Sequence, residues 1–289
     1  MPLLAIALIL LQTQPSLRAS VETRIAHAPV RAVGLYYRDL TVGDSLTVGS
    51  DVRFHAASTM KIPVMIQLFR DRDAGFLSLD DSVTITNTFR SIVDSSPYQL
   101  DVTDDSDSSL YKRLGQRASI RELIELMETV SSNLATNLLI AKVDAKRANA
   151  TAHALGADSI LVLRGVEDNK AYQAGLNNTT TARDLGMLLA AIAKGTAASP
   201  ASCRDMLAIL GRQQFNEGIP AGLPAGTHVY HKTGWIGQVV YHDAAYVETQ
   251  PGGRGYILVV LTGGIQKDSD AHALVRDLSK LVFDARRKR

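Results

Sequence analysis

The chain has 289 residues, 46% of them hydrophobic, so it can bury a large core in one domain of two lobes or in two domains. Its 31 basic and 29 acidic residues leave a formal net charge of +2, which gives no general electrostatic case for nucleic-acid binding. Cys203 is the only cysteine, so there is no intrachain disulfide. No set of His, Cys and acidic residues has metal-ligand spacing, and we expect no metal and no other cofactor.

The N-terminus holds a short apolar run, Pro2 to Leu11. This run is too short to span a bilayer and suits the core of a signal peptide over residues 1–20. A buried N-terminal helix is the alternative, because no basic residue precedes the run and residues 17–20 form a poor cleavage site. We expect a periplasmic or secreted protein without stable membrane insertion.

Strands are predicted towards both ends of the chain and helices in its middle. Ser20 can cap a helix to Ala28. Alternating residues and turn signals predict strands at 32–39, 45–54, 228–233, 239–249 and 256–261, with a hairpin loop at 251–255. Helical patterns predict helices at 59–74, 119–129, 134–143, 145–155, 182–193, 202–210 and 270–283. Ser119 with Glu122 and Thr181 with Asp184 have capping-box spacing at two of these helix starts. We therefore expect one antiparallel sheet with helices (residues 21–57 and 202–289), an all-helical lobe (residues 58–201) and a ligand cleft between them.

The segment around Ser58-Thr59-Met60-Lys61 is the strongest candidate for chemistry. Ser58 and Lys61 share one face of the predicted helix, so an amine lies beside a hydroxyl. A neighbouring base activates a serine as a nucleophile, and the helix N-terminus supplies N–H groups for an oxyanion. A second match, Ser109-Leu110-Tyr111-Lys112, lies in an acidic, serine-rich loop without an apolar helix after it, which favours ordinary surface.

Three short elements occur in order: Ser58-Thr59-Met60-Lys61, Ser131-Ser132-Asn133 and Lys232-Thr233-Gly234. With these gaps the chain resembles the class A β-lactamases and related penicillin-binding proteins over nearly all of its length after residue 20. The resemblance implies a β-lactamase/DD-peptidase-like fold, α/β plus all-α, with a five-stranded antiparallel sheet built from both chain ends and an inserted helical lobe.

The resemblance also implies the catalytic roles. Ser58 would form an acyl-enzyme, Lys61 would accept or relay its proton, and Ser131 would pass a proton to the leaving nitrogen. Glu167 would activate the water that hydrolyses the acyl-enzyme. The three motif residues have ordinary alternatives: Ser131 as a helix cap, Asn133 as a turn residue and Lys232 as an exposed strand lysine.

Substrate-binding roles follow from the same resemblance. Asn133 would bind the side-chain amide, and Lys232 and Thr233 would hold the substrate carboxylate, with Lys232 also depressing the pKa of Lys61. Gly234 would let the substrate backbone lie against the strand. The N–H groups of Ser58 and Trp235 would form the oxyanion hole.

Several positions depart from the family pattern. The residue four places after Glu167 is usually Asn and here is Ala171, while Asn169 lies two places on; Arg164 is one residue further from Glu167 than usual. The middle residue of the second motif is Ser132 rather than Asp.

Other features concern the cleft and its supports. The acidic segment 94–109 should border the cleft, and the bulky Trp235 should narrow it. Asn137 matches a residue that ties the helical lobe to the catalytic loop, whereas His231 and His242 are expected to be structural.

Three functions remain open at this stage. The first is a class A-like β-lactamase, and the second is a DD-peptidase or esterase-like serine hydrolase in which Glu167 is not positioned for water. The third, a β-lactam receptor that acylates without turnover, is disfavoured because such receptors are normally attached to membrane helices. In each case the expected partner is a small molecule, a β-lactam or cell-wall peptide analogue, and we expect a monomer.

Overall fold

The computed structural model describes residues 16–250 and 254–287. The predicted signal-peptide core at residues 2–11 lies outside the described residues, as do residues 251–253 of the last predicted hairpin loop. Within the described part of the chain, no helix is both long and apolar enough to cross a membrane.

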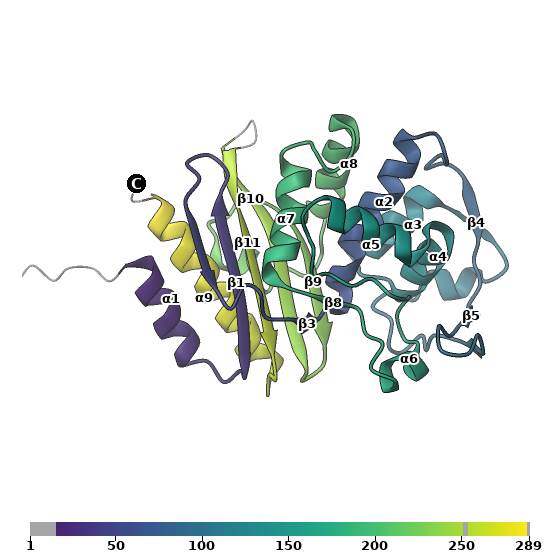
Figure 1. Ribbon diagram of the computed structural model, residues 1–289, viewed down its shortest axis with the longest axis horizontal. Coiled ribbons are helices and arrows are strands. Elements are labelled where there is room, and N and C mark those ends of the chain that lie inside the picture. Colours follow the sequence, from purple (N-terminus) through teal and green to yellow (C-terminus); the bar gives the residue numbers. More distant parts are fainter. Residues whose placement is uncertain (1–15, 251–253, 288–289) are drawn as a thin grey trace, which may run out of the picture.

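One antiparallel sheet of five strands is built from both ends of the chain, which confirms the predicted fold class (Figure 1). Its order is β2-β1-β11-β10-β9, so β9 is an edge strand. The strands are β1 (Ala32–Asp39), β2 (Ser45–Val48), β9 (His228–Ile236), β10 (Val240–Gln250) and β11 (Arg254–Gly263). An edge position leaves β9 available to face the second lobe.

Alternating residues of β1 separate the two cores of the molecule. Leu35 and Tyr37 pack under α1 (Leu17–Ala26) and α9 (Asp268–Arg287), while Tyr36 faces the larger core on the other side of the sheet. Helix α1 begins earlier than predicted, because Ser16 Oγ accepts the N–H of Ala19 at 3.2 Å. The predicted cap, Ser20, is therefore an internal helix residue.

Helix α7 (Ala182–Ala193) covers the sheet face opposite to α1 and α9, packing on β1, β10 and β11. Thr181 caps it as predicted, with its Oγ1 accepting the N–H of Asp184 at 3.1 Å. A Cβ at Gly186 would lie 2.3 Å from the ring of Tyr36, so only glycine allows this close approach. The predicted lobes placed α7 with the helical lobe, whereas in Figure 1 it lies between the sheet and that lobe.

The helical lobe surrounds α2, which contacts α3, α4, α5 and α8. Residues 62–69 of α2 are all buried, and Pro63 falls in its first turn, where a missing N–H costs nothing. Ser119 caps α3 as predicted, accepting the N–H of Glu122 at 3.1 Å. The helices are α2 (Lys61–Asp73), α3 (Ile120–Thr129), α4 (Asn133–Val143), α5 (Ala145–Ala154), α6 (Asn169–Gln173) and α8 (Pro200–Leu210).

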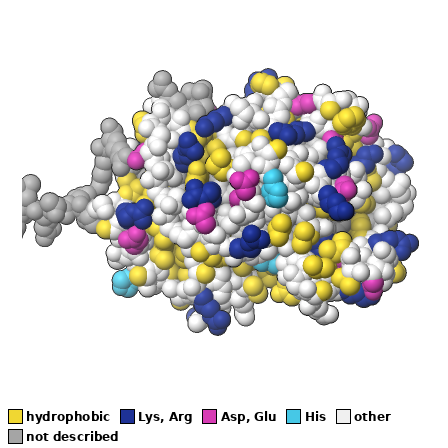
Figure 2. All heavy atoms as spheres, viewed as in Figure 1, with side chains coloured by type: hydrophobic (Ala, Val, Ile, Leu, Met, Phe, Trp, Pro, Cys, Tyr) yellow, Lys and Arg dark blue, Asp and Glu magenta, His cyan; other side chains and the backbone are white. Residues whose placement is uncertain are grey.

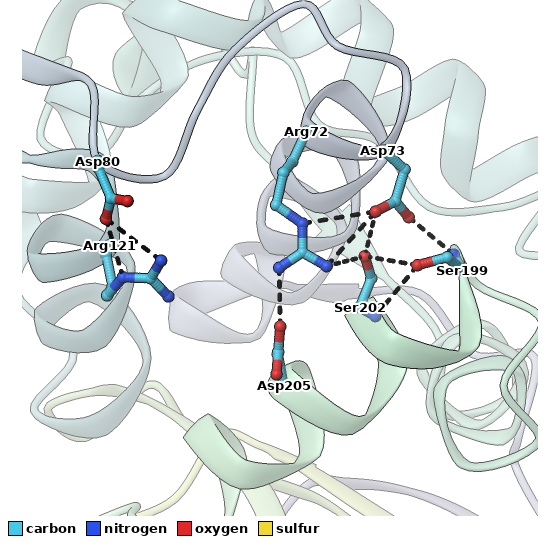
Figure 3. A network of polar contacts seen from close by, with 7 residues as sticks. All are labelled: Arg72, Asp73, Asp80, Arg121, Ser199, Ser202 and Asp205. Atoms are coloured by element: carbon cyan, nitrogen blue, oxygen red, sulfur yellow. Dashed lines mark hydrogen bonds and ion pairs between the residues drawn. The ribbon is translucent and has the colours of Figure 1, made fainter.

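A polar network fixes the end of α2 that is remote from Ser58 (Figure 3). Arg72 donates to Asp205 at 2.7 Å, and Asp73 accepts from the N–H of Ser199 at 2.8 Å and the hydroxyl of Ser202 at 2.5 Å. These contacts join the C-terminal end of α2 to the start of α8.

The predicted strand at 45–54 is divided in the structure. Only Ser45–Val48 joins the main sheet, as β2; Phe54–His55 forms β3, which pairs with β8 (Thr179–Thr180). This small ribbon lies just before Ser58 in the chain. It therefore holds the serine turn beside the segment that follows Glu167. Two further ribbons pair β4 (Ser82–Thr84) with β7 (Arg117–Ser119) and β5 (Phe89–Arg90) with β6 (Pro97–Tyr98).

The face drawn in Figure 2 carries basic and acidic side chains interspersed, without a large patch of one sign. This distribution agrees with the small net charge of +2.

Candidate active site

Ser58 lies on a short 3₁₀ turn, η1 (Ala57–Met60), between β3 and α2. The sequence predicted a helix from Thr59, but α2 itself begins at Lys61. Ala57 has a φ of +45°, and its N–H donates to Nδ1 of His55 at 3.0 Å. Non-glycine residues in this conformation are strained and need support from their surroundings. The strained turn presents the half-buried Ser58 at the cleft.

Lys61 is fully buried at the start of α2. Its Nζ donates to the carbonyl oxygen of Ser131 at 2.7 Å, to Oγ of Ser131 at 3.1 Å and to Oδ1 of Asn133 at 3.1 Å. Lys61 therefore joins the serine turn to the second motif.

Burial lowers the pKa of Lys61 well below its ordinary range, and the neighbouring charge of Lys232 lowers it further. Three carboxylates oppose this shift: Asp105, Glu128 and Glu167. Because a neutral amine can accept a proton, the environment prepares Lys61 to act as a base.

Ser131 Oγ is shared by two lysines, accepting from Lys61 at 3.1 Å and from Lys232 at 3.0 Å. A hydroxyl oxygen has two acceptor sites, so the Ser131 proton remains available for another acceptor. Helix capping falls to Ser132, whose Oγ accepts the N–H of Ala135 at 3.3 Å. In this motif the helix cap is therefore Ser132 and not Ser131.

The third motif lies on edge strand β9. Lys232 is fully buried and also donates to the carbonyl of Thr233 at 3.0 Å, so it is not an exposed strand lysine. A Cβ at Gly234 would lie 3.1 Å from Cγ2 and 3.2 Å from N of Thr59. The absence of a side chain at Gly234 therefore lets β9 pack against η1 within the protein. From the sequence we had expected it to let the substrate backbone lie against the strand.

Glu167 is in a left-handed conformation, with φ of +59°, on the loop before α6. Its Oε1 accepts from Nδ2 of Asn133 at 2.8 Å, and its Oε2 accepts from the N–H of Asp101 at 3.3 Å. Burial raises the pKa of Glu167, while the bond from Asn133 opposes the rise. Asn133 thus bridges Lys61 to Glu167 through its two amide atoms.

Asn137 clamps the Glu167 loop to α4, as the sequence indicated. Its Oδ1 accepts from the N–H of Val166 at 2.7 Å, and its Nδ2 donates to the carbonyl of Val166 at 3.0 Å. Arg164 is buried in the same loop, and its Nε donates to the carbonyl of Leu176 at 2.9 Å. These bonds fix the backbone on the N-terminal side of Glu167.

Residues 169–173 form the short helix α6. Asp168 caps it by accepting the N–H of Ala171 at 3.1 Å. Ala171 is fully buried and offers no side-chain polar group, so it cannot hold a water as an Asn could. Asn169, two residues after Glu167, is the side-chain amide nearest to Glu167 in the sequence, and it lines the same cavity.

Two adjoining cavities meet at Ser58, which lines both together with Asp104, Asn133 and Trp235. One, of about 540 Å³, contains Glu167. The other, of about 530 Å³, contains Ser131 and Thr233 and is bordered by part of the acidic segment, residues 103–106, as expected. Its described lining includes four acids and no lysine or arginine: Asp104, Asp105, Glu217 and Asp268.

Asp105 is a site residue that the sequence did not single out. Its Oδ1 accepts the N–H of Asn133 at 2.9 Å, and its Oδ2 accepts the N–H of Leu134 at 2.8 Å and the hydroxyl of Tyr111 at 3.0 Å. A carboxylate at a helix N-terminus satisfies orphan N–H groups and the helix dipole. Asp105 therefore ties the acidic segment to the start of α4.

The remaining predicted residues have clear surroundings. Trp235 is 55% exposed at the junction of the two cavities. His231 Nδ1 lies 2.9 Å from Asp243 Oδ1, and His242 Nε2 lies 2.9 Å from the carbonyl oxygen of His55. Burial lowers the pKa of His242 to about 4. Both histidines have partners that fit a structural role.

Two other sequence predictions concern the rest of the chain. Cys203 is buried, and no group of three metal-ligating side chains occurs among residues 16–250 and 254–287. The second Ser-x-x-Lys match spans Ser109 and a short 3₁₀ turn, η2 (Leu110–Arg113), with Lys112 exposed.

Comparison with known proteins agrees with this geometry. The model of the β-lactamase enzyme family matches residues 16–285, so the chain belongs to that family. A β-lactamase of Bacteroides uniformis is 25% identical over 262 residues, which cover 85% of this chain and 83% of the relative.

Solved structures give the same assignment. PBP-A has a TM-score of 0.80 and 30% identity, over 94% of this chain and 96% of its own. A β-lactamase from Sphaerobacter thermophilus has a TM-score of 0.78 and 27% identity, over 93% and 96% of the two chains. The protein thus has the fold of the β-lactamase-family hydrolases.

Proposed function

We propose that this protein is a class A-like serine β-lactamase that opens the β-lactam amide through an acyl-enzyme on Ser58. The observation that carries the proposal is the position of Ser58 where two cavities meet, with the lysine–serine cluster on one side and Glu167 on the other. The two halves of such a reaction, acylation and hydrolysis, need these two groups.

In the acylation step, Ser58 Oγ attacks the lactam carbonyl carbon and its proton passes to neutral Lys61. The N–H groups of Ser58 and Trp235 are the proposed oxyanion donors, and both residues line both cavities. As the C–N bond breaks, the nitrogen takes the proton of Ser131. Lys61, 3.1 Å from Ser131 Oγ, returns a proton to that hydroxyl.

In the deacylation step, a water attacks the acyl carbon and gives its proton to Glu167. The proton then returns to the Ser58 oxygen as the ester bond breaks, so one water is consumed overall. The hydrogen bond from Asn133 holds one carboxylate oxygen of Glu167 and leaves a lone pair on each oxygen for a water.

A DD-peptidase or esterase-like hydrolase with slow deacylation is the second candidate. Buried Ala171 favours it, because the loop lacks an amide at that position to hold water. The 30% identity to PBP-A also favours it, and a substituted variant of PBP-A has been solved as an acyl-enzyme complex with penicillin G. We further propose, from the apolar N-terminal run, that the protein acts in the periplasm or after secretion.

Turnover distinguishes the two candidates. We expect purified protein to hydrolyse a chromogenic cephalosporin through many cycles, and Ser58→Ala to show none. A single burst equal to the enzyme concentration, followed by a stable product on the protein, would assign the second candidate instead. A tenfold rate difference corresponds to about 1.4 kcal/mol of barrier, so even a small displacement of water would be visible.

A further inference from the structure

Glu128 is a buried acid that the proposed mechanism leaves unused. It lies in the last turn of α3, three residues before Ser131, and is 0% exposed. Neither of its carboxyl oxygens has a hydrogen-bond partner among the described residues. The backbone here is fixed, since the carbonyl of Glu128 accepts from Nε2 of Gln213 at 2.7 Å. This main-chain bond does not involve the carboxyl group, so it does not explain why the carboxyl group is buried.

The other acids of α3 show how unusual this position is. Glu122 pairs with Arg113, and Glu125 accepts hydrogen bonds from Arg212 at both carboxylate oxygens, with Nε–Oε1 at 2.7 Å. Both pairs are partly exposed to solvent. Glu128 has no arginine partner among the described residues and no contact with solvent. An ionised carboxyl in such a place is tolerated only beside a compensating positive charge.

Buried lysines supply that charge when they are protonated. Burial raises the pKa of Glu128 to about 7, and the charges of Lys232 on β9 and Lys61 on α2 oppose that rise. Glu128 in turn opposes the burial that lowers the pKa of Lys232, helped by Asp243. On Lys61 it acts together with Asp105 and Glu167, against burial and Lys232.

We propose that Glu128 is a positioning residue that keeps buried Lys232 protonated beneath Ser131, so that this lysine can attract an anionic substrate. The inference rests on the proposed function for its catalytic consequence. Lys232 donates to Ser131 Oγ at 3.0 Å, and the adjoining cavity is lined by four acids without lysine or arginine among its described residues. Lys232 does not line this cavity itself, but through its bond to the lining residue Ser131 it is the positive charge that we assign to a carboxylate there.

The consequence depends on substrate charge. Without the Glu128 carboxylate, Lys232 releases its proton at lower pH, and the cavity then repels anions. KM for an anionic penicillin should rise at alkaline pH, whereas KM for a neutral ester substrate should not. A purely structural contribution of Glu128 would instead change kcat and stability equally for both substrates.

The direct test is an NMR titration of ¹⁵N-labelled lysine side chains, which needs no catalytic activity. In Glu128→Gln the Lys232 signal, assigned with Lys232→Arg, should titrate about 1 pH unit lower than in the wild type, as expected for loss of an opposite charge. The matched control is Glu125→Gln on the same helix, in which the Lys232 midpoint should not move. An unchanged midpoint in Glu128→Gln would overturn the proposal.

A second variant covers the case in which Glu128→Gln does not fold. Glu128→Asp keeps the charge. Its Lys232 titration midpoint should lie above that of Glu128→Gln. If Glu128→Asp is the only variant that folds, its Lys232 midpoint should lie within a few tenths of a pH unit of the wild-type value. A fall of 1 unit in Glu128→Asp would contradict the charge role. If the wild type is never acylated by lactams, the proposed function fails, while the lysine titration still decides the role of Glu128.

Discussion

Replacing Asp105 by Ala should weaken the attachment of the acidic segment to the start of α4. The change removes a carboxylate that accepts three backbone N–H groups, two of them at the start of α4 and one from Asp107, and a tyrosine hydroxyl. Hydrogen bonds to charged groups contribute about 1.5–3 kcal/mol, and a carboxylate near a helix N-terminus adds about 0.3–1 kcal/mol through the helix dipole. We expect Asp105→Ala to lower the free energy of unfolding by ~3 kcal/mol.

Thermal unfolding followed by circular dichroism measures this loss. For a protein of this size the expected fall in Tm is roughly 6–12 °C, at about 2–4 °C per kcal/mol. The control is Asp107→Ala in the same segment, because among the described residues the Asp107 carboxylate accepts from Ser109 alone, from its N–H at 3.1 Å and its hydroxyl at 2.7 Å. If Asp105→Ala is no less stable than Asp107→Ala, the bonds from Asp105 to α4 do not support the site.

Three further predictions concern the catalytic loop and the cleft. Glu167 must be ionised to act as a base, and burial raises its pKa above the ordinary 4.5. As the pH is lowered, the deacylation rate should therefore begin to fall at a higher pH than it would with a solvent-exposed glutamate. Asn133→Ala removes the bond that opposes this rise, so its acid limb should move to higher pH in a deacylation pH profile; a move to lower pH would contradict the assignment. Asn137→Ala removes both hydrogen bonds from Asn137 to the backbone of Val166 and should slow deacylation roughly tenfold or more, with less effect on acylation, in single-turnover kinetics; equal slowing of both steps would refute the clamp. Trp235→Gly should broaden the range of accepted lactams, because the indole stands between the two cavities, and an unchanged kcat/KM profile would count against it.

Local patterns in the sequence predicted most of the elements, because caps and hydrophobic periodicity act over a few residues. Ser119 and Thr181 were identified as helix caps from spacing alone, and both accept the expected N–H groups. The motif residues were also found by spacing, and the structure brings Lys61, Ser131 and Lys232 into one hydrogen-bonded cluster.

What the sequence missed depends on contacts between distant segments. Asp105 is one of many acids in its segment, and only the folded chain brings it to Asn133, 28 residues away. Glu128 follows Glu122 and Glu125 at helical spacing and looks like another surface acid, yet it alone is fully buried. The split of the predicted strand at 45–54 depends on β8, more than a hundred residues later.

The central claim is that Ser58 carries the acyl group, and mass spectrometry of the trapped adduct tests it most directly. Glu167→Gln, mixed with penicillin G and quenched in acid, should gain the mass of one intact penicillin on the proteolytic peptide that contains Ser58. Ser58→Ala in the same background should gain none. An adduct on another peptide, or one that persists in Ser58→Ala, would contradict the account.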